Sequence, residues 1–136
     1  MSQPAGYSGT PLPRKLGVGA GTRVLLDSAP AGFALAPLPE DVTVHRRAGR
    51  DPYDVIVVFC PDLATLVRRW PALHARTTTP GALWVAWPKR AAKLPTDLDE
   101  NIVRDYGLDH GRVDVKVCAI DAIWSGLKFV IRLADR

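Results

Sequence analysis

The sequence predicts an α/β domain with a mixed six-stranded sheet, and three observations lead to this prediction. Segments rich in β-branched residues alternate with helix-like segments through the middle of the chain, as in parallel strands joined by helical crossovers. Residues 53–60 form the clearest strand, because their consecutive apolar side chains suit a strand that is covered on both faces. The last two strands are joined only by residues 121–126, so the final strand should run antiparallel to its neighbour.

The chain has 136 residues, enough for one hydrophobic core, and its 47% hydrophobic and 24% charged residues are typical of a globular domain. Residues 1–9 are predicted to form a flexible N-terminal arm, and residues 10–136 a single domain. The longest apolar run, residues 55–60, is far shorter than the roughly 20 residues that span a bilayer, and no signal peptide is evident. These features predict a cytoplasmic protein without a membrane partner.

The N-terminal half is predicted to contribute three strands and two short helices. The first helix should begin with Thr10 as its N-cap and Pro11 at the first helical position, where proline is favoured. Residues 23–27 form a short apolar run that ends in a proline-containing turn, which predicts a buried strand. Residues 32–38 are predicted to form a short helix, and the alternating residues 42–46 an edge strand.

A longer helix is predicted to follow the central strand and to open at Asp62. Its apolar stripe recurs at i, i+3, i+4 and i+7, the spacing of one buried helix face, and consists of Leu63, Leu66, Val67 and Trp70. Pro71 should kink or restart this helix, because proline cannot donate the backbone hydrogen bond. Residues 77–81 contain a Pro-Gly pair and are predicted to form a turn.

The C-terminal part is predicted to contribute three strands and one helix. The helix should cover residues 97–106, with Thr96 and Asp99 as a capping box and Gly107 as its stop. The strands are predicted at residues 82–87, 113–120 and 127–133. Right-handed crossovers and the closing hairpin then give the sheet order second, first, third, fourth, sixth, fifth.

The two cysteines are predicted to remain unpaired thiols. Cys60 ends the third strand and Cys118 lies near the end of the fifth, at the far edge of the sheet. Three strand steps separate them by roughly 14 Å, whereas a disulfide requires Cα atoms within about 7 Å.

The predicted order of strands and helices resembles the class I methyltransferase fold, a three-layer Rossmann-like domain, with one strand–helix unit deleted early. In that fold the fifth strand follows a Pro-Gly turn, and the segment Pro-Gly-Ala-Leu-Trp-Val at 80–85 is similar to this turn and strand. The resemblance implies a methyl donor above the first strand, held by a glycine-rich loop and by an acidic residue at the end of the second strand.

This chain departs from the methyltransferase pattern at both donor-binding positions. The loop after Asp27 has one glycine and contains a proline, and the second strand ends in His45-Arg46-Arg47 without a carboxylate. We therefore predict no cofactor, and weak or no binding of S-adenosylmethionine.

A second resemblance covers nearly the whole chain. Gly-Tyr-Ser-Gly-Thr-Pro-Leu at 6–12, Leu-Trp-Val-Ala-Trp-Pro-Lys at 83–89 and Trp-Ser-Gly-Leu-Lys-Phe at 124–129 are similar to segments of a bacterial domain-of-unknown-function family, number three-zero-five-two. The resemblance implies a small single-domain bacterial protein without an assigned activity, and it transfers no catalytic residue.

Candidate ligand-binding residues follow from the rule that ligands bind beyond the carboxyl ends of parallel strands. Those ends and the adjacent helix start and hairpin carry the six candidates Asp27, Ser28, Lys89, Thr96, Trp124 and Ser125. Lys89 could pair with Asp27 or bind an anionic ligand. Trp124 should lie at the same sheet edge as Lys89, where its ring either caps the core or stacks on a ligand.

The remaining chemistry-bearing residues do not form a recognisable catalytic or metal motif. The three histidines and two cysteines show no metal-ligand spacing, and Ser28 lacks the Gly-x-Ser-x-Gly pattern of a nucleophile elbow. We assign no catalytic residue and favour a non-enzymatic protein.

Three functions are compatible with these observations. The favoured one is a small non-catalytic binding or regulatory module on a degenerate methyltransferase-like scaffold, with an anionic small molecule or a protein as its partner. An alternative is a small transferase-type enzyme that binds an anionic molecule through Asp27, Lys89 and Trp124. A third, disfavoured because the net charge is only +4, is a weak nucleic-acid binder that uses Arg46, Arg47, Arg50, Arg68 and Arg69.

Overall fold

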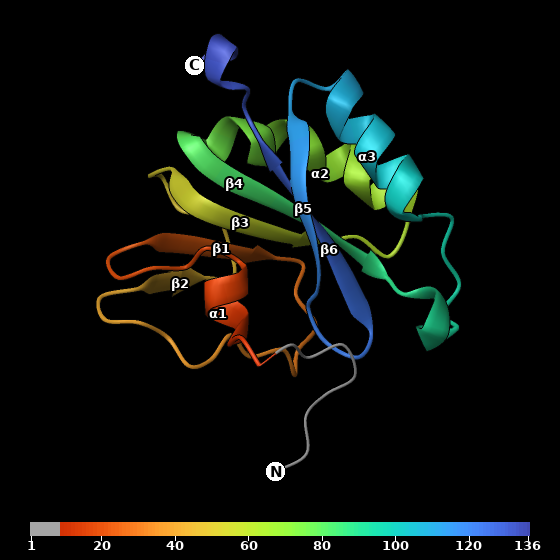
Figure 1. The fold of residues 1–136 in the computed structure, drawn as a ribbon, viewed down its shortest axis with the longest axis horizontal. Helices are drawn as coiled ribbons and strands as arrows, with labels where there is room; N and C mark the ends of the chain where they lie inside the picture. The colour runs from red at the N-terminus through yellow and green to blue at the C-terminus, as the bar shows by residue number, and fades with distance from the viewer. Residues whose placement is uncertain (1–8) are drawn as a thin grey trace.

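A computed structural model describes residues 9–136, so nearly all of the predicted arm lies outside the described residues. The model contains a six-stranded sheet in the order β2-β1-β3-β4-β6-β5, which confirms the predicted order (Figure 1). β1, β2, β3 and β4 pair in parallel, whereas β6 pairs antiparallel to both β4 and β5. The predicted antiparallel last strand is therefore confirmed.

The strands are β1 (Arg23–Asp27), β2 (Thr43–His45), β3 (Tyr53–Phe59), β4 (Thr77–Pro88), β5 (Val113–Ala119) and β6 (Trp124–Val130). The helices are α1 (Leu12–Lys15), α2 (Leu63–Arg76) and α3 (Glu100–Asp109), with 3-10 turns η1 (Arg90–Ala92) and η2 (Leu133–Asp135). The sheet lies between two layers, since α2 and α3 cover one face and α1 with the segment after β1 covers the other (Figure 1).

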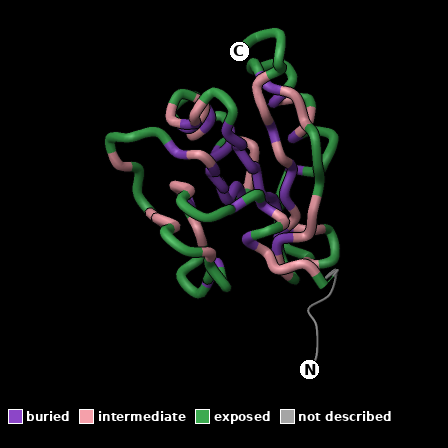
Figure 2. The backbone as a smooth tube through the Cα atoms, turned by 60° about the vertical axis from the view of Figure 1, so that its left-hand side comes forward, coloured by how far each residue is buried: buried purple, intermediate pink, exposed green. Residues whose placement is uncertain are grey.

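Each face of the sheet has its own hydrophobic core. On the α2 and α3 face, Ile56 and Phe129 of the sheet pack with Leu66 and Trp70 of α2. On the α1 face, the Trp84 indole is fully buried and donates a hydrogen bond to the Leu16 carbonyl over 3.1 Å. Figure 2 shows the buried backbone concentrated in the central strands, between exposed loops. The central strands are covered on both faces, as their continuous apolar runs predicted.

Helix α2 begins as predicted but continues through its proline. The Asp62 carboxylate accepts a hydrogen bond from the Thr65 N–H over 2.8 Å, which makes Asp62 the N-cap. The predicted restart at Pro71 is wrong, because Pro71 lies inside one continuous helix. The carbonyl that loses its partner belongs to Val67, whose side chain is 48% exposed rather than part of the buried stripe. Water can reach this exposed face, which lowers the cost of the missing hydrogen bond.

The predicted turn at 77–81 is instead the start of β4. Tyr53 pairs with Thr77 and Val55 pairs with Ala82. Between these two pairs the chain moves five residues along β4 but only two along β3. The extra residues form a bulge in which Gly81 packs tightly, because a Cβ there would lie 2.8 Å from the Asp54 carbonyl oxygen. The Pro-Gly pair therefore marks an irregularity within a strand rather than the end of a helix-to-strand link.

The short helix predicted at 32–38 is absent. Phe33 and Leu35 are both buried, as expected for extended backbone that turns alternate side chains toward the sheet. Pro37 and Pro39 also remove two backbone donors that a helix would use. The predicted N-cap at Thr10 is wrong as well: α1 begins at Leu12, with Pro11 at the capping position.

The closing elements are displaced from their predicted bounds. α3 starts at Glu100 with Asp99 as N-cap and continues past Gly107, whereas the sequence predicted a helix at 97–106. β6 starts at Trp124 rather than 127, because the Asp121 carboxylate accepts hydrogen bonds from the Ile123 and Trp124 N–H groups and tightens the turn. Trp124 thus belongs to the strand.

The cysteines lie at opposite faces of the sheet as well as on distant strands. Cys60 packs in the core under α2, and Cys118 packs against the core under α1. Both are free thiols. We expect mass spectrometry of the native protein after mild oxidation to show no intramolecular disulfide, and such a bond between Cys60 and Cys118 would contradict the strand order.

Candidate functional site

A groove of about 650 Å³ opens at the carboxyl end of β4. Its apolar part comes from the end of β4 and the chain leading to α3, and consists of Trp87, Pro88, Leu94 and Leu98. The groove also includes the first turn of α3 and Ser125 of β6, the residue paired with Trp87. Its size is typical of a small-molecule site, and it lies at the sheet edge where open α/β folds bind ligands.

The charged residues of the groove come from two different segments. Lys89 and Arg90 follow β4 directly, while the acidic residues Asp97, Asp99 and Glu100 precede or begin α3. Among residues 9–136, no carboxylate lies within ion-pair distance of the two cationic side chains. The cations of the groove are therefore available to a ligand.

Each carboxylate of the groove has one oxygen engaged in the fold. Asp97 accepts a hydrogen bond from the Leu63 N–H of α2 over 2.8 Å, and Asp99 accepts one from the Ile102 N–H of α3. Glu100 pairs with Arg104 over 2.5 Å. The acidic residues thus neutralise helix amino-terminal ends and one arginine, which is a structural role, but one oxygen of each has no hydrogen bond within residues 9–136.

Half of the six predicted ligand residues come together in this groove. Lys89, Thr96 and Ser125 line it, whereas Asp27, Ser28 and Trp124 do not. Sequence reasoning missed Arg90 and Asn101 as lining residues. Arg90 directly follows Lys89 and could have been found from the same strand end. Asn101 was missed because the helix was predicted to begin at residue 97, three residues before the observed start of α3 at Glu100.

Trp124 lies at the predicted edge, because it pairs with Pro88 and the Lys89 N–H donates to the Ile123 carbonyl over 2.7 Å. Its ring, however, packs on the α1 face, edge-on to Phe59 at 5.2 Å between centroids. Adjacent residues of a strand point to opposite faces, so Ser125 faces the groove and Trp124 the core. The ring therefore caps the core.

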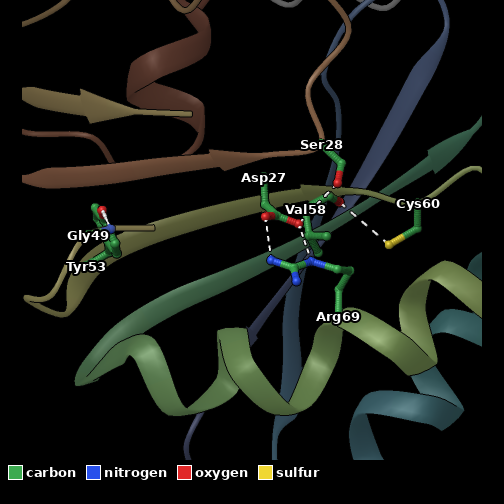
Figure 3. A network of polar contacts seen from close by, with 7 residues as sticks. All are labelled: Asp27, Ser28, Gly49, Tyr53, Val58, Cys60 and Arg69. Atoms are coloured by element: carbon green, nitrogen blue, oxygen red, sulfur yellow. Dashed lines mark hydrogen bonds and ion pairs between the residues drawn. The ribbon is translucent and has the colours of Figure 1, made fainter. Parts of the chain in front are cut away.

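Asp27 is engaged by an arginine of α2 rather than by Lys89 (Figure 3). Arg69 donates two hydrogen bonds to its carboxylate, Nε to Oδ2 over 2.9 Å and Nη2 to Oδ1 over 2.8 Å. The Ser28 hydroxyl also lies 3.3 Å from Oδ2. The predicted pairing of Asp27 with Lys89 is wrong, because Asp27 pairs instead with Arg69 of α2, the helix that packs on β3 beside β1.

The residues at the donor position of the methyltransferase fold do not fit a methyl donor. The carboxylate at the end of β1, that of Asp27, is bound by Arg69, as described above. At the end of β2, His45 Nδ1 lies 2.5 Å from the Tyr53 hydroxyl, and Arg46 donates to the Phe33 carbonyl. None of these groups is a carboxylate free to bind ribose hydroxyls, so the chain lacks the polar partners that the resemblance implies.

The arginines considered for nucleic acid do not act as one free group. Arg69 is bound to Asp27 and Arg46 to a backbone carbonyl, so two of the five predicted contacts serve the fold. Arg47, Arg50 and Arg68 are exposed. Three exposed arginines on two separated segments are a small electrostatic footprint for a nucleic acid.

A buried arginine without an acidic partner lies at the opposite end of the sheet. The Arg112 side chain is 1% exposed, and its Nε donates to Nδ1 of His74 over 2.9 Å. A second nitrogen, Nη2, donates to the His74 carbonyl near the end of α2, where a cation is favoured. Burial lowers the pKa of Arg112 to about 10. His74 must stay neutral to accept the hydrogen bond from Nε.

We expect the protein to lose stability as the pH falls below about 6.5, the ordinary histidine value. Burial, and secondarily the Arg112 charge, hold the pKa of His74 below that value in the fold. As the pH falls, His74 is therefore protonated in the unfolded chain before it is protonated in the fold. The free energy of unfolding decreases between the unfolded-state pKa and the lower pKa of folded His74. Urea unfolding at pH 7.5 and 5.0 should show a smaller loss for His74→Asn, and an equal loss in both proteins would contradict this coupling.

Several solved structures are similar to the chain, among them the following two. The N-methyltransferase NodS from Bradyrhizobium japonicum has a TM-score of 0.54 and 14% identity, with 90% of this chain and 98% of that chain covered. An rRNA methylase from Streptococcus thermophilus has a TM-score of 0.54 and 10% identity, with 93% and 99% covered. The fold is methyltransferase-like. No family model and no curated protein matches the chain.

Residues 9–136 also lack two other features that could indicate a function. No helix in this part of the chain is both long and apolar enough to cross a membrane. No group of three or more histidine, cysteine or acidic side chains there could hold a metal ion.

Proposed function

We propose that this protein is a non-catalytic binding or regulatory module that holds a small molecule with an anionic group in the groove beside β4. The observation that carries the proposal is the contrast between two positions at one sheet edge. At the end of β1 the Asp27 carboxylate is already paired with Arg69, whereas the groove at the end of β4 holds Lys89 and Arg90 without ion pairs among residues 9–136.

The absence of an activated nucleophile or base in the groove supports a non-catalytic role. All three histidines lie elsewhere: His45 contacts Tyr53, His74 accepts from Arg112, and His110 contacts the Tyr106 carbonyl. Ser125 therefore has no histidine base among the lining residues. Burial, with smaller contributions from nearby carboxylates, raises the pKa of the Cys60 thiol to about 12, which keeps it protonated.

An anionic group would contact the cationic side of the groove. Lys89 is half-buried at the end of β4 and its backbone is held by the Ile123 carbonyl, so its position is better defined than that of a loop lysine. A lysine ammonium binds carboxylates and phosphates as a point charge. The apolar part of the groove suits a ligand that also carries a hydrocarbon portion.

The test is a thermal-shift screen of the full chain against phosphorylated metabolites and aliphatic carboxylates. A ligand that binds only the folded state raises the melting temperature. The shift should be lost in Lys89→Gln and retained in Lys93→Gln, which removes the same charge from a residue outside the groove. If no compound that carries an anionic group raises the melting temperature, or if Lys89→Gln behaves as wild type, the proposal is wrong.

S-adenosylmethionine is expected to have a dissociation constant above about 10 μM, which corresponds to a binding free energy less favourable than about −7 kcal/mol. The physical reason is that Arg69 binds the carboxylate at the end of β1 and that β2 ends without an acid. Calorimetry at neutral pH measures this directly. Tighter binding would favour the alternative of a small transferase, the class to which the two similar structures named above belong.

We also propose that the chain belongs to the bacterial family described above and acts in the cytoplasm. Two of the three segments that resemble this family, 83–89 and 124–129, are paired neighbours in β4 and β6, and both reach the groove. Two cysteines that lie too far apart to pair fit a reducing compartment.

A further inference from the structure

We infer that the ligand of the β4 groove is a zwitterion of about dipeptide size, with its anionic group at Lys89 and Arg90 and its cationic group at the acidic start of α3. This inference rests on the proposed binding function of the same groove and specifies the chemistry of its ligand. Cationic and acidic side chains both line the groove, and within residues 9–136 no ion pair joins Lys89 or Arg90 to these carboxylates.

The first step of the argument concerns the unpaired charges. Lys89 and Arg90 have no ion pair among residues 9–136, although three carboxylates line the same groove. The elements explain this separation, because the cations follow β4 whereas Asp97 and Asp99 precede α3. Both segments are held by hydrogen bonds. The Lys89 N–H donates to the Ile123 carbonyl, and the Asp97 carboxylate accepts from the Leu63 N–H. Each of the two charged segments of the groove is thus fixed by a hydrogen bond.

The second step concerns the remaining capacity of the carboxylates. Asp97 and Asp99 each use Oδ1 to accept a backbone N–H, and their Oδ2 atoms have no hydrogen bond within the described chain. A carboxylate accepts up to about four hydrogen bonds. Each can therefore still accept from an ammonium group without breaking the contact that fixes it.

The third step concerns the size and polarity of the ligand. A purely anionic ligand would meet Lys89 and Arg90 but would also lie near three carboxylates, which repel it. A ligand with both charges can pair with the cations and with the carboxylates, and of the apolar residues that line the groove Leu94 lies between these two segments in the chain. A volume of about 650 Å³ admits a ligand larger than a single amino acid.

The experiment compares three forms of one dipeptide by calorimetry on the full chain. The probes are Leu-Leu, N-acetyl-Leu-Leu, which lacks the cation, and Leu-Leu-amide, which lacks the anion. We expect Leu-Leu to bind at least tenfold more tightly than either capped form. Equal binding of N-acetyl-Leu-Leu would overturn the zwitterion inference while leaving the anion-binding proposal intact.

Charge-removing variants assign each end of the ligand. In Lys89→Gln, Leu-Leu should no longer bind more tightly than Leu-Leu-amide. In the double variant Asp97→Asn, Asp99→Asn, it should no longer bind more tightly than N-acetyl-Leu-Leu. Asparagine retains the oxygen that accepts the backbone N–H, so both helix starts are preserved. The matched controls are Lys93→Gln and Asp109→Asn, which lie outside the groove and should change nothing.

Three further outcomes test this inference alongside the proposed function. If no dipeptide form binds but a phosphorylated metabolite or carboxylate raises the melting temperature through Lys89, the zwitterion inference fails and the binding proposal stands. If neither the dipeptides nor those compounds bind, both fail. Binding of Leu-Leu that is unchanged in the Lys89 and Asp97/Asp99 variants would also overturn the inference, because the ligand would then lie elsewhere.

Discussion

Replacing Trp124 by alanine is expected to lower the free energy of unfolding by about 3–5 kcal/mol, the usual cost of deleting a buried aromatic side chain. The Trp124 ring is only 9% exposed and packs edge-on against Phe59, which in turn packs against Phe33 at 4.9 Å between centroids. Removing the indole opens a cavity in this aromatic row, and the rigid sheet beneath it cannot collapse to fill the space.

Urea denaturation of Trp124→Ala, Trp124→Phe and Ile123→Ala measures this effect. Phenylalanine retains most of the ring contact and should cost less than alanine. The neighbouring Ile123 is 43% exposed, so its truncation should change little. Ligand binding in the β4 groove should survive in folded Trp124→Phe, because the ring faces away from that groove. A stable Trp124→Ala protein that has lost ligand binding would contradict the capping role.

Replacing Gly107 by alanine is expected to destabilise the protein, although alanine is the better helix former. An added Cβ would lie 2.1 Å from Cε1 of Phe129, whose ring is fully buried and cannot move aside. Overpacking costs typically about 1–3 kcal/mol, and so short a contact belongs at the upper end. Helix propensity returns about 1 kcal/mol, so we expect a net loss of about 2 kcal/mol.

A double-mutant cycle with Phe129→Leu tests the cause of this loss. The smaller leucine side chain makes room for the new methyl group, so the double variant should be more stable than the sum of the single effects predicts. Gly19→Ala is the control, because no atom lies within 4 Å of a Cβ built there. Additive effects of Gly107→Ala and Phe129→Leu would show that the contact is not the cause.

The strands were predicted well because their signals are local. The apolar run in β3 and the apolar run in β1 each indicate a strand from their own residues, and short links limit how neighbouring strands can connect. The strand order then followed from the handedness of crossovers and from the closing hairpin. These are properties of short chain segments, and they are visible without knowledge of distant contacts.

The candidate site was predicted only in part, because its composition depends on contacts between distant segments. Lys89 and Ser125 could be placed at the sheet edge from topology alone. The true partner of Asp27 could not, since Arg69 lies 42 positions away and reaches it only because α2 packs on β3, the strand next to β1. The same limit explains Gly107: glycine usually ends a helix, but here the buried Phe129 ring requires it inside α3.

The sequence by itself determined the α/β class, the order of the strands and the absence of a glycine-rich donor loop, because each is encoded in residue types and spacing along the chain. Only the tertiary structure decided which charges are paired and which remain free. Asp27 is neutralised by Arg69, while Lys89 and Arg90 face a groove with no ion pair among residues 9–136. The physical reason is that electrostatic partners are chosen by distance in space, and packing of helices on a sheet sets that distance.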